Sequence, residues 1–330
     1  MHKPTLTIGI PTRNRADLIS VLLDDIFSQL SKGNRNRVMV VVSDNASDVS
    51  YNAVITKYNI LNPGAVKYIR NNTDIGFSAN VNMAIRSADS DFVMIMSDDD
   101  GLEPGTISAV LEMLDTHPDI GIGMLAHNTY DKTLTKETRA FSSSVSGYFR
   151  NGADYLNSIP SFPDALISGY VINRHHWIEN FSPDFTTINS IHFIMMPLLI
   201  AKFPCFALGN KGYVKYRSDM GLWSIDTDPL YPFPMFASYL KSCQINKHIL
   251  SKQLHEKMYC STMRTVIGFT IRNKVLGYRF PRKDILRVLS PHFDCDTFRK
   301  WIYTKCAQML MRVPMWMLYV PFRWLVPEKL

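Results

Sequence analysis

The chain has 330 residues, 46% of them hydrophobic and 20% charged, which is typical of a folded protein of one or two domains and excludes a disordered or fibrous one. Its net charge of +7 is unevenly distributed: residues 241–330 hold 17 Lys and Arg against 5 Asp and Glu, whereas residues 1–240 hold 19 against 24. The five cysteines form no C-x-x-C pair, and the first residues show no signal-peptide pattern, so we expect free thiols and a cytoplasmic protein.

The first 120 residues alternate between patterns typical of strands and of helices. Short apolar runs rich in β-branched residues predict strands at 6–10, 38–42, 66–69 and 91–96. Apolar residues with helical spacing predict helices at 18–30, 78–87 and 106–114. This alternation predicts right-handed β-α-β crossovers and therefore an α/β domain with helices on both faces of a mostly parallel sheet.

A polar cluster follows each predicted strand. These clusters are PTRNR (11–15), SDNAS (43–47), RNNTDIGFSAN (70–80) and SDDD (97–100). Asn and Asp also form ordinary turns, but the carboxyl ends of parallel strands share one edge of the sheet, where α/β domains bind ligands. Four clusters at one edge therefore predict a ligand site. The glycine-rich motifs of dinucleotide oxidoreductases and P-loop NTPases do not occur, which disfavours both classes.

Three adjacent aspartates, Asp98, Asp99 and Asp100, follow the fourth predicted strand, with no Lys or Arg among them. Their carboxylates repel one another unless a cation neutralises them. Carboxylates at a strand end suit Mg²⁺ or Mn²⁺ held by one or two protein oxygens and by substrate phosphates. Such an ion stabilises a departing diphosphate. The alternative is an acidic turn at the start of the next helix, but three carboxylates exceed what a helix start requires.

Four segments in this order resemble glycosyltransferase family 2, whose members are inverting enzymes with the GT-A fold. The segments are PTRNR after its strand, VVVSDNAS, NNTDIGFSANVNMAI and FVMIMSDDDGLEPGTI, within residues 5–115. The SDDD form, with Ser97 in place of a first Asp, looks closest to O-antigen sugar transferases of the abequosyltransferase type. The resemblance implies a GT-A domain with a Rossmann-like sheet over residues 1–225, divided into a nucleotide-sugar half (1–115) and an acceptor half (116–225).

The resemblance also implies roles for individual positions. The residues expected to contact the nucleotide-sugar are Pro11, Thr12, Arg13, Asp44, Asn45, Asn72, Gly76, Asn80 and Asp98. Asp44 is expected to accept from the base, and Gly76 is expected because a side chain there would crowd the backbone. The expected ligands of Mn²⁺ or Mg²⁺ are Asp99 and Asp100. Asp99 matches the second Asp of the family's D-x-D, and Asp98 with Asp100 forms a literal one.

An inverting transfer needs a general base that takes the proton of the acceptor hydroxyl. Many family members use an Asp from an acidic pair beyond the metal site, and this sequence has no such pair. His192 lies near the corresponding position, and its ordinary pKa suits base catalysis near neutrality, although it can equally pack on the helix that follows. Asp184 and Asp219 are the alternatives. Arg217 is a candidate for neutralising the diphosphate or for a plain surface ion pair.

Residues 226–330 are expected to form a helical, basic region that associates with membranes. Within it, residues 299–327 mix Trp, Phe, Met and Leu with Lys and Arg. Arg312, Pro314 and Pro321 interrupt any transmembrane span, which needs about 20 apolar residues. An amphipathic segment in the interface of an anionic membrane fits this composition, and a buried helical hairpin is the alternative.

The resemblance therefore implies a metal-dependent inverting glycosyltransferase of the hexosyltransferase type. The substrates that it implies are a nucleotide-sugar and a saccharide acceptor on a lipid carrier, in bacterial O-antigen or capsule biosynthesis at the inner face of the cell membrane. One alternative is a catalytically inactive, membrane-associated scaffold that binds nucleotide-sugars. Another is an enzyme acting on nucleic acid, but the basic residues of the C-terminal part are interleaved with Trp, Met and Leu rather than set on a polar face.

Overall fold

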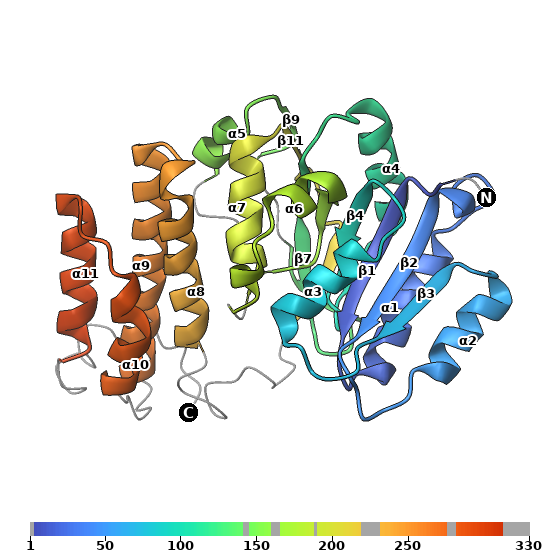
Figure 1. Ribbon diagram of the computed structural model, residues 1–330, viewed down its shortest axis with the longest axis horizontal. Helices are drawn as coiled ribbons and strands as arrows, with labels where there is room; N and C mark the ends of the chain where they lie inside the picture. The colour runs from blue at the N-terminus through green and yellow to red at the C-terminus, as the bar shows by residue number, and fades with distance from the viewer. Residues whose placement is uncertain are drawn as a thin grey trace. The chain divides into compact units, whose positions relative to one another are not determined.

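The computed structural model describes residues 3–140, 145–159, 166–187, 190–218, 232–275 and 282–312. The chain forms two compact units (Figure 1). Unit 1 comprises Met1–Ser158 and Asp164–Met220, and unit 2 comprises Ile159–Pro163 and Gly221–Leu330. The predicted domain boundary at residue 225 lies outside the described residues and stays a prediction.

Unit 1 is built on an eight-stranded sheet with the order β3-β2-β1-β4-β10-β6-β11-β9. Its strands are β1 (Leu6–Thr12), β2 (Val38–Asp44), β3 (Val66–Arg70), β4 (Phe92–Ile95), β6 (Ile122–Leu125), β9 (Gly147–Phe149), β10 (Tyr170–Asn173) and β11 (Cys205–Leu208). Only β10 and β9 run against the other strands described in this sheet. The predicted mostly parallel sheet is therefore confirmed, with its four predicted strands side by side at one end.

Helices cover both faces of this sheet (Figure 1). They are α1 (Ala16–Ser28), α2 (Asn52–Leu61), α3 (Phe77–Arg86), α4 (Thr106–Thr116), α5 (Gly152–Ser158), α6 (Arg174–Asn180) and α7 (His192–Lys202). Leu6, Ile8 and Ile10 of β1 belong to one hydrophobic cluster, which also contains Leu22 of α1 and Val110 of α4. On the opposite face, α3 packs close to β1. A Cβ added at Gly9 would lie only 3.6 Å from the Cβ of Ala84 on α3.

A second, four-stranded sheet in unit 1 has the order β5-β12-β7-β8. Its strands are β5 (Gly101–Leu102), β7 (His127–Tyr130), β8 (Glu137–Arg139) and β12 (Val214–Arg217). Because β5 directly follows the three aspartates and pairs with β12, this sheet brings Arg217 next to the acidic segment. The sequence did not predict this sheet, since its strands are short and several of its side chains are polar.

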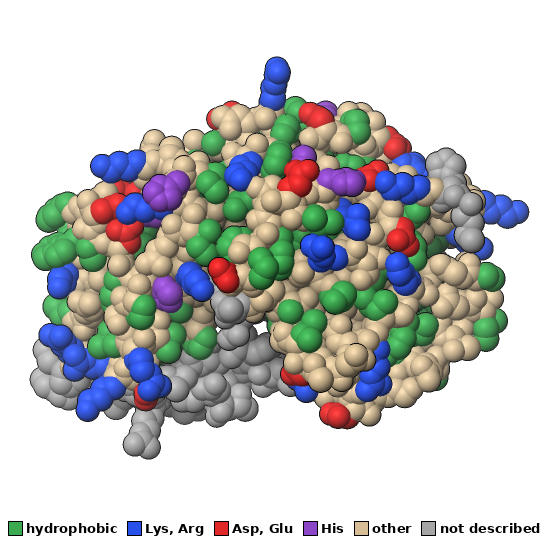
Figure 2. Space-filling view, viewed as in Figure 1, with side chains coloured by type: hydrophobic (Ala, Val, Ile, Leu, Met, Phe, Trp, Pro, Cys, Tyr) green, Lys and Arg blue, Asp and Glu red, His purple; other side chains and the backbone are tan. Residues whose placement is uncertain are grey.

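The described part of unit 2 is helical, as expected. Its main helices are α8 (Pro232–Ile245), α9 (Lys252–Val275), α10 (Arg282–Leu289) and α11 (Phe298–Leu310). On the visible face of these helices, both Lys or Arg and hydrophobic side chains are exposed (Figure 2). Among the described residues, no helix combines the length and the apolar character that crossing a membrane requires.

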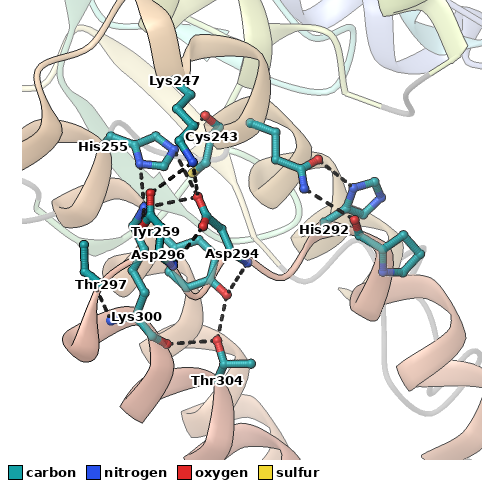
Figure 3. A network of polar contacts seen from close by, with 12 residues as sticks. Cys243, Lys247, His255, Tyr259, His292, Asp294, Asp296, Thr297, Lys300 and Thr304 are labelled. Carbon is teal, nitrogen blue, oxygen red and sulfur yellow. Dashed lines mark hydrogen bonds and ion pairs between the residues drawn. The ribbon is translucent and has the colours of Figure 1, made fainter.

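A buried ionic network joins three helices of unit 2 (Figure 3). The ammonium of Lys300 on α11 lies 2.8 Å from Nδ1 of His255 on α9, 2.8 Å from Oδ1 of Asp296 and 3.2 Å from Oδ2 of Asp294. Nε2 of His255 is 2.9 Å from the carbonyl of Cys243 on α8, so it is the donor there and Nδ1 accepts from Lys300. Burial and the adjacent ammonium lower the pKa of His255, which favours this neutral form.

Candidate active site

The candidate site lies at the carboxyl ends of β1, β2 and β4, where three of the predicted polar clusters meet. β1 and β4 are parallel neighbours, so the residues that follow them are adjacent. The hydroxyl of Thr12 donates to Oδ2 of Asp98 at 2.6 Å, and the hydroxyl of Tyr51 lies 2.7 Å from the same Thr12 oxygen. The backbone N–H of Arg15 donates to Tyr51 at 2.9 Å. The PTRNR loop is thus fixed against the acidic segment by buried hydrogen bonds.

Arg15 supplies the positive charge that the acidic segment lacks in its own sequence. Its Nη1 donates to Oδ1 of Asp98 at 2.8 Å and to Oδ2 of Asp99 at 3.0 Å. The hydroxyl of Ser97 donates to Oδ1 of Asp99 at 2.5 Å. We did not predict Arg15, Tyr51 or Ser168 as site residues from the sequence, and for Arg15 the only signal was its place in the PTRNR cluster.

Asp100 is buried and lies apart from this pairing. Its Oδ2 accepts from the hydroxyl of Ser168 at 2.5 Å, and its Oδ1 accepts from the backbone N–H of Arg217 at 3.0 Å. Ser168 Oγ also accepts from the N–H of Ser97 at 2.8 Å. Both oxygens of Asp100 are therefore used in anchoring the turn, Oδ1 to β12 and Oδ2 to Ser168 before β10. Asp99 is the more accessible of the two predicted metal ligands.

Burial makes the charged forms of the Asp98 and Asp100 carboxyls less favourable and raises their pKa. Burial raises the pKa of Asp98 to about 6, although Arg15 opposes the shift and the charge of Asp99 adds to it. Burial, with a further contribution from Asp99, raises the pKa of Asp100 to about 7. A site of this kind gains from any added cation.

Arg217 approaches the acidic segment from β12 and is buried. Its Nε donates to the carbonyl of Asp99 at 2.5 Å, and its Nη1 donates to the carbonyl of Lys132 at 2.6 Å. Its Nη2 is buried and has no hydrogen-bond partner within the described part of the chain. Among the described residues, Nη2 of this buried guanidinium is therefore uncommitted beside the carbonyl of Asp99, and such an arrangement is uncommon and costly.

Asp44, the predicted acceptor from the base, is fully buried at the end of β2. Its Oδ1 accepts from the N–H of Ser47 at 2.9 Å, its Oδ2 accepts from the hydroxyl of Tyr68 at 2.6 Å, and Nε of Arg70 lies 3.8 Å away. These partners hold the SDNAS turn in place. Burial and the adjacent carboxylate raise the pKa of Tyr68, which keeps this phenol a donor.

Two predicted nucleotide-binding asparagines hold loops together. Nδ2 of Asn80 donates to the carbonyl of Ser43 at 2.9 Å, and its Oδ1 accepts from the hydroxyl of the same serine at 2.7 Å. Nδ2 of Asn45 donates to Asp74 at 2.5 Å, and its Oδ1 accepts from the N–H of Ile75 at 2.9 Å. Asn80 therefore holds the end of β2, and Asn45 holds the 71–76 loop.

The remaining residues predicted to contact the nucleotide-sugar differ in their exposure. Pro11 is a buried residue of β1, Asn72 is exposed, and exposed Arg13 forms an ion pair with Asp74. The reason for a glycine at position 76 differs from the expected one. A Cβ there would meet nothing within 4 Å, but φ is +81°, a conformation that other residues rarely adopt.

The three candidates for the general base have different surroundings. His192 is the first residue of α7 and is buried, and its ring centroid lies 6.4 Å from that of Phe77, the first residue of α3. It therefore lies beside the loop that ends at Gly76. Asp184 is exposed in the short 3₁₀ helix Pro183–Thr187. Asp219 lies outside the described residues.

The site fits a divalent cation that shares its ligands with a substrate. Within the described residues, no group of three or more His, Cys, Asp or Glu could hold a metal ion by itself. Mg²⁺ and Mn²⁺ commonly bind through one or two carboxylates and complete their shell with phosphate oxygens and water. Asp99, whose carboxylate is partly accessible, meets this requirement.

The comparisons with known proteins agree with this geometry. Residues 7–169 match the family model Glycosyl transferase family 2. An "Uncharacterized glycosyltransferase" of Haemophilus influenzae is 28% identical over 115 residues, which cover 35% of this chain and 36% of that protein. The match thus spans about a third of the length of this curated relative.

Solved structures resemble almost the whole chain. S. aureus TarS 1-349 in complex with UDP is 14% identical with a TM-score of 0.68, covering 98% of this chain and 93% of that one. The mannosyltransferase PcManGT from Pyrobaculum calidifontis, in complex with GDP-Man and Mn²⁺, is 14% identical with a TM-score of 0.55, covering 94% and 87%. The expected GT-A fold is therefore confirmed.

Proposed function

We propose that this protein is an inverting glycosyltransferase that moves a sugar from a nucleotide-sugar donor to a saccharide acceptor. The observation that carries the proposal is the carboxylate pair of Asp98 and Asp99, held at the end of β4 against the PTRNR loop within the residues that match the family 2 model. The UDP and UDP-GlcNAc complexes of TarS and the GDP-Man complex of PcManGT support a nucleotide-sugar as the donor.

In an in-line displacement, the residues of the site would have different roles. The β1 end with Thr12 and the β2 end with Asp44 and Asn45 would form the nucleotide pocket. Asp99 would hold Mn²⁺ or Mg²⁺, which when bound supplies Lewis-acid stabilisation of the leaving diphosphate. The uncommitted Nη2 of Arg217 is a further donor next to Asp99. Positioning and electrostatics of this kind need no covalent enzyme intermediate.

We place the acceptor hydroxyl near His192, which would act as the general base, with Asp184 and Asp219 as alternatives. The support is the position of His192 beside Phe77, at the start of the helix that follows the predicted nucleotide loop. An acceptor of the O-antigen or capsule type on a lipid carrier, as in abequosyltransferase-type enzymes, fits a chain with a basic helical unit.

The exposed side of α11, which we call the α11 face, supports contact with an anionic membrane surface. Its large apolar residues are Phe298, Trp301, Ile302 and Met309, the first of them 76% exposed. Arg299 and Lys305 are also exposed on this helix, which contains no acidic residue. Exposed aromatic and basic side chains on one helix are typical of segments that lie in a membrane interface. A cytoplasmic, peripheral location is proposed on this ground.

Donor hydrolysis and transfer assays test the proposed function. We expect turnover of one nucleotide-sugar by the wild type and a loss of at least about 100-fold in Asp99→Ala, because one interaction with the transition-state charge is removed. Asp115→Ala, which removes an exposed carboxylate on α4, is the matched control and should keep full activity. Nucleotide-sugar binding without turnover in the wild type would instead support the scaffold.

A further inference from the structure

Arg15 lies where a cation would sit between Asp98 and Asp99. One guanidinium nitrogen, Nη1, contacts both carboxylates, at 2.8 Å and 3.0 Å. The Arg15 side chain is 23% exposed, and the carboxylates of Asp98 and Asp99 are 4% and 16% exposed. The ion pairs are therefore partly shielded from water. Charge–charge interactions in such a place are stronger than at an open surface.

The two oxygens of Asp99 are both engaged in this arrangement. Oδ2 accepts from Arg15 at 3.0 Å, and Oδ1 accepts from the hydroxyl of Ser97 at 2.5 Å. A divalent cation at Oδ2 would stand within a few ångströms of the guanidinium, and the two positive charges would repel each other. The ion pair with Arg15 and a bound metal therefore compete for the same oxygen.

The Arg15 backbone is held by a hydrogen bond, whereas its side chain is partly exposed. The N–H of Arg15 donates to the hydroxyl of Tyr51 at 2.9 Å, and the side chain is 23% exposed. The guanidinium, however, is bound to the aspartates through Nη1 alone among the contacts of the described residues. Its other donors can bind a phosphate in the fork geometry that suits guanidinium groups.

We propose that Arg15 neutralises Asp98 and Asp99 in the absence of substrate and prevents a divalent cation from binding Asp99. When a nucleoside diphosphate binds, the guanidinium of Arg15 leaves Asp99 and binds the phosphates instead. This inference rests on the proposed donor site and adds the order in which that site fills. The diphosphate frees Oδ2 of Asp99 and also supplies the remaining metal ligands. Metal and nucleotide then bind cooperatively, and each raises the affinity for the other by the same factor.

The test measures Mn²⁺ affinity in the full chain by EPR detection of free Mn²⁺. Titrations are made without nucleotide and with the one of UDP, GDP, CDP and dTDP that raises the melting temperature most. We expect the wild type to bind Mn²⁺ at least about tenfold more tightly with the nucleotide. Arg15→Gln should bind Mn²⁺ alone about tenfold more tightly than the wild type, and should lose most of the gain from nucleotide. Equal or weaker binding of Mn²⁺ alone by Arg15→Gln would overturn the proposal.

Arg13→Gln is the matched control. Arg13 is two residues away in the same loop but pairs with Asp74, so its replacement removes the same charge without freeing Asp99. Its Mn²⁺ affinity without nucleotide should stay within about twofold of the wild type, because the charge is screened at the surface. An equal gain in Arg13→Gln would show a general charge effect and would refute the gating role.

Two further variants keep the test decisive. Asp99→Asn should abolish tight Mn²⁺ binding, and retained binding would place the metal elsewhere and overturn the proposal. If Arg15→Gln fails to fold, Arg15→Lys replaces the planar fork by a compact charge on a shorter stem and should give a smaller gain, of about threefold. No gain in Arg15→Lys would then count against the proposal.

The outcomes separate this inference from the proposed function. If no nucleoside diphosphate raises the melting temperature of the wild type, the donor site itself is refuted. If a nucleotide binds clearly and Arg15→Gln leaves the Mn²⁺ affinity unchanged, only the gating role of Arg15 is refuted.

Discussion

The hydroxyl of Thr12 donates to Oδ2 of Asp98 at 2.6 Å and thereby joins the carboxyl ends of β1 and β4. This bond links the predicted nucleotide pocket to the acidic segment. The hydroxyl of Tyr51, 2.7 Å from the same Thr12 oxygen, completes a buried chain of hydrogen bonds that ends at the backbone of Arg15. The site is therefore organised by neutral side chains as much as by charged ones.

We expect Thr12→Val to destabilise the protein by about 1–3 kcal/mol, because Asp98 and Tyr51 each lose a buried hydrogen-bond partner. Nucleotide affinity should fall as well, since the PTRNR loop loses one of its links to the acidic segment after β4. Urea unfolding and nucleotide titration measure the two effects. Thr12→Ser keeps the hydroxyl and serves as the control, and an equal loss in both variants would show that the methyl group matters instead.

The stability of the metal-free protein should contain a contribution from Asp100 that decreases as pH rises. The folded-state pKa of about 7 is above the ordinary value of 3.8, so the folded protein retains a proton that the unfolded chain releases. This contribution is fully present below about pH 4 and is lost as pH rises through about 7. The lowered pKa of His255 acts in the opposite direction, so the whole-protein profile does not isolate the effect.

Comparison with Asp100→Asn isolates the effect. The amide stays uncharged at every pH, so the melting temperature of the variant relative to the wild type should increase between pH 5 and pH 8 in EDTA. Asp115→Asn, at an exposed position paired with Arg37, should follow the wild type over the same range. A constant difference between Asp100→Asn and the wild type would contradict the raised pKa of Asp100.

We expect Lys300→Met to destabilise the protein by about 3 kcal/mol, because the change removes the buried ammonium that pairs with Asp294 and Asp296 and leaves Asp294 with the more exposed Lys247. Lys305→Met on the exposed side of the same helix is the control and should cost less than about 0.5 kcal/mol. Urea unfolding followed by far-ultraviolet circular dichroism measures both. Equal stability of the two variants would show that the network of Figure 3 contributes little.

Flotation with vesicles of phosphatidylglycerol and phosphatidylcholine tests the α11 face. The wild type should float, and the double variant Phe298→Ser, Trp301→Ser should bind at least about tenfold more weakly, since each side chain buries apolar area in the interface. Ile60→Ser, Leu61→Ser removes two exposed apolar side chains from α2 and should float like the wild type. Unchanged flotation of the α11 variant would contradict a role for this face.

The elements that the sequence predicted well have strong local patterns. The helix expected at 18–30 is α1 at Ala16–Ser28, and the strand expected at 38–42 is β2 at Val38–Asp44. Helix α2 was missed because its apolar residues do not form one stripe: Ile55 and Tyr58 are buried, whereas Ile60 and Leu61 are exposed. Local periodicity predicts an element only where one face alone is apolar.

The site was predicted in outline because polar residues at strand ends converge in any parallel sheet. Its ionic pairing was not predicted, since Arg15 and Asp99 are 84 residues apart and meet only through the β1–β4 neighbourhood. The roles of the three adjacent aspartates also depend on the direction of each side chain. A run of identical residues gives no information on these directions. Asp100 turns toward Ser168, and Asp99 turns toward Arg15.

The most direct test of the central claim is a thermal-shift titration of UDP-, GDP-, CDP- and dTDP-sugars, with and without Mn²⁺, in the wild type and in Asp99→Asn. We predict that one donor raises the melting temperature of the wild type, that Mn²⁺ increases the shift, and that Asp99→Asn loses this increase, because a ligand stabilises the state that it binds. A donor-induced shift of the same size in Asp99→Asn, with the same response to Mn²⁺, would contradict the claim that Asp99 holds a metal at the donor diphosphate.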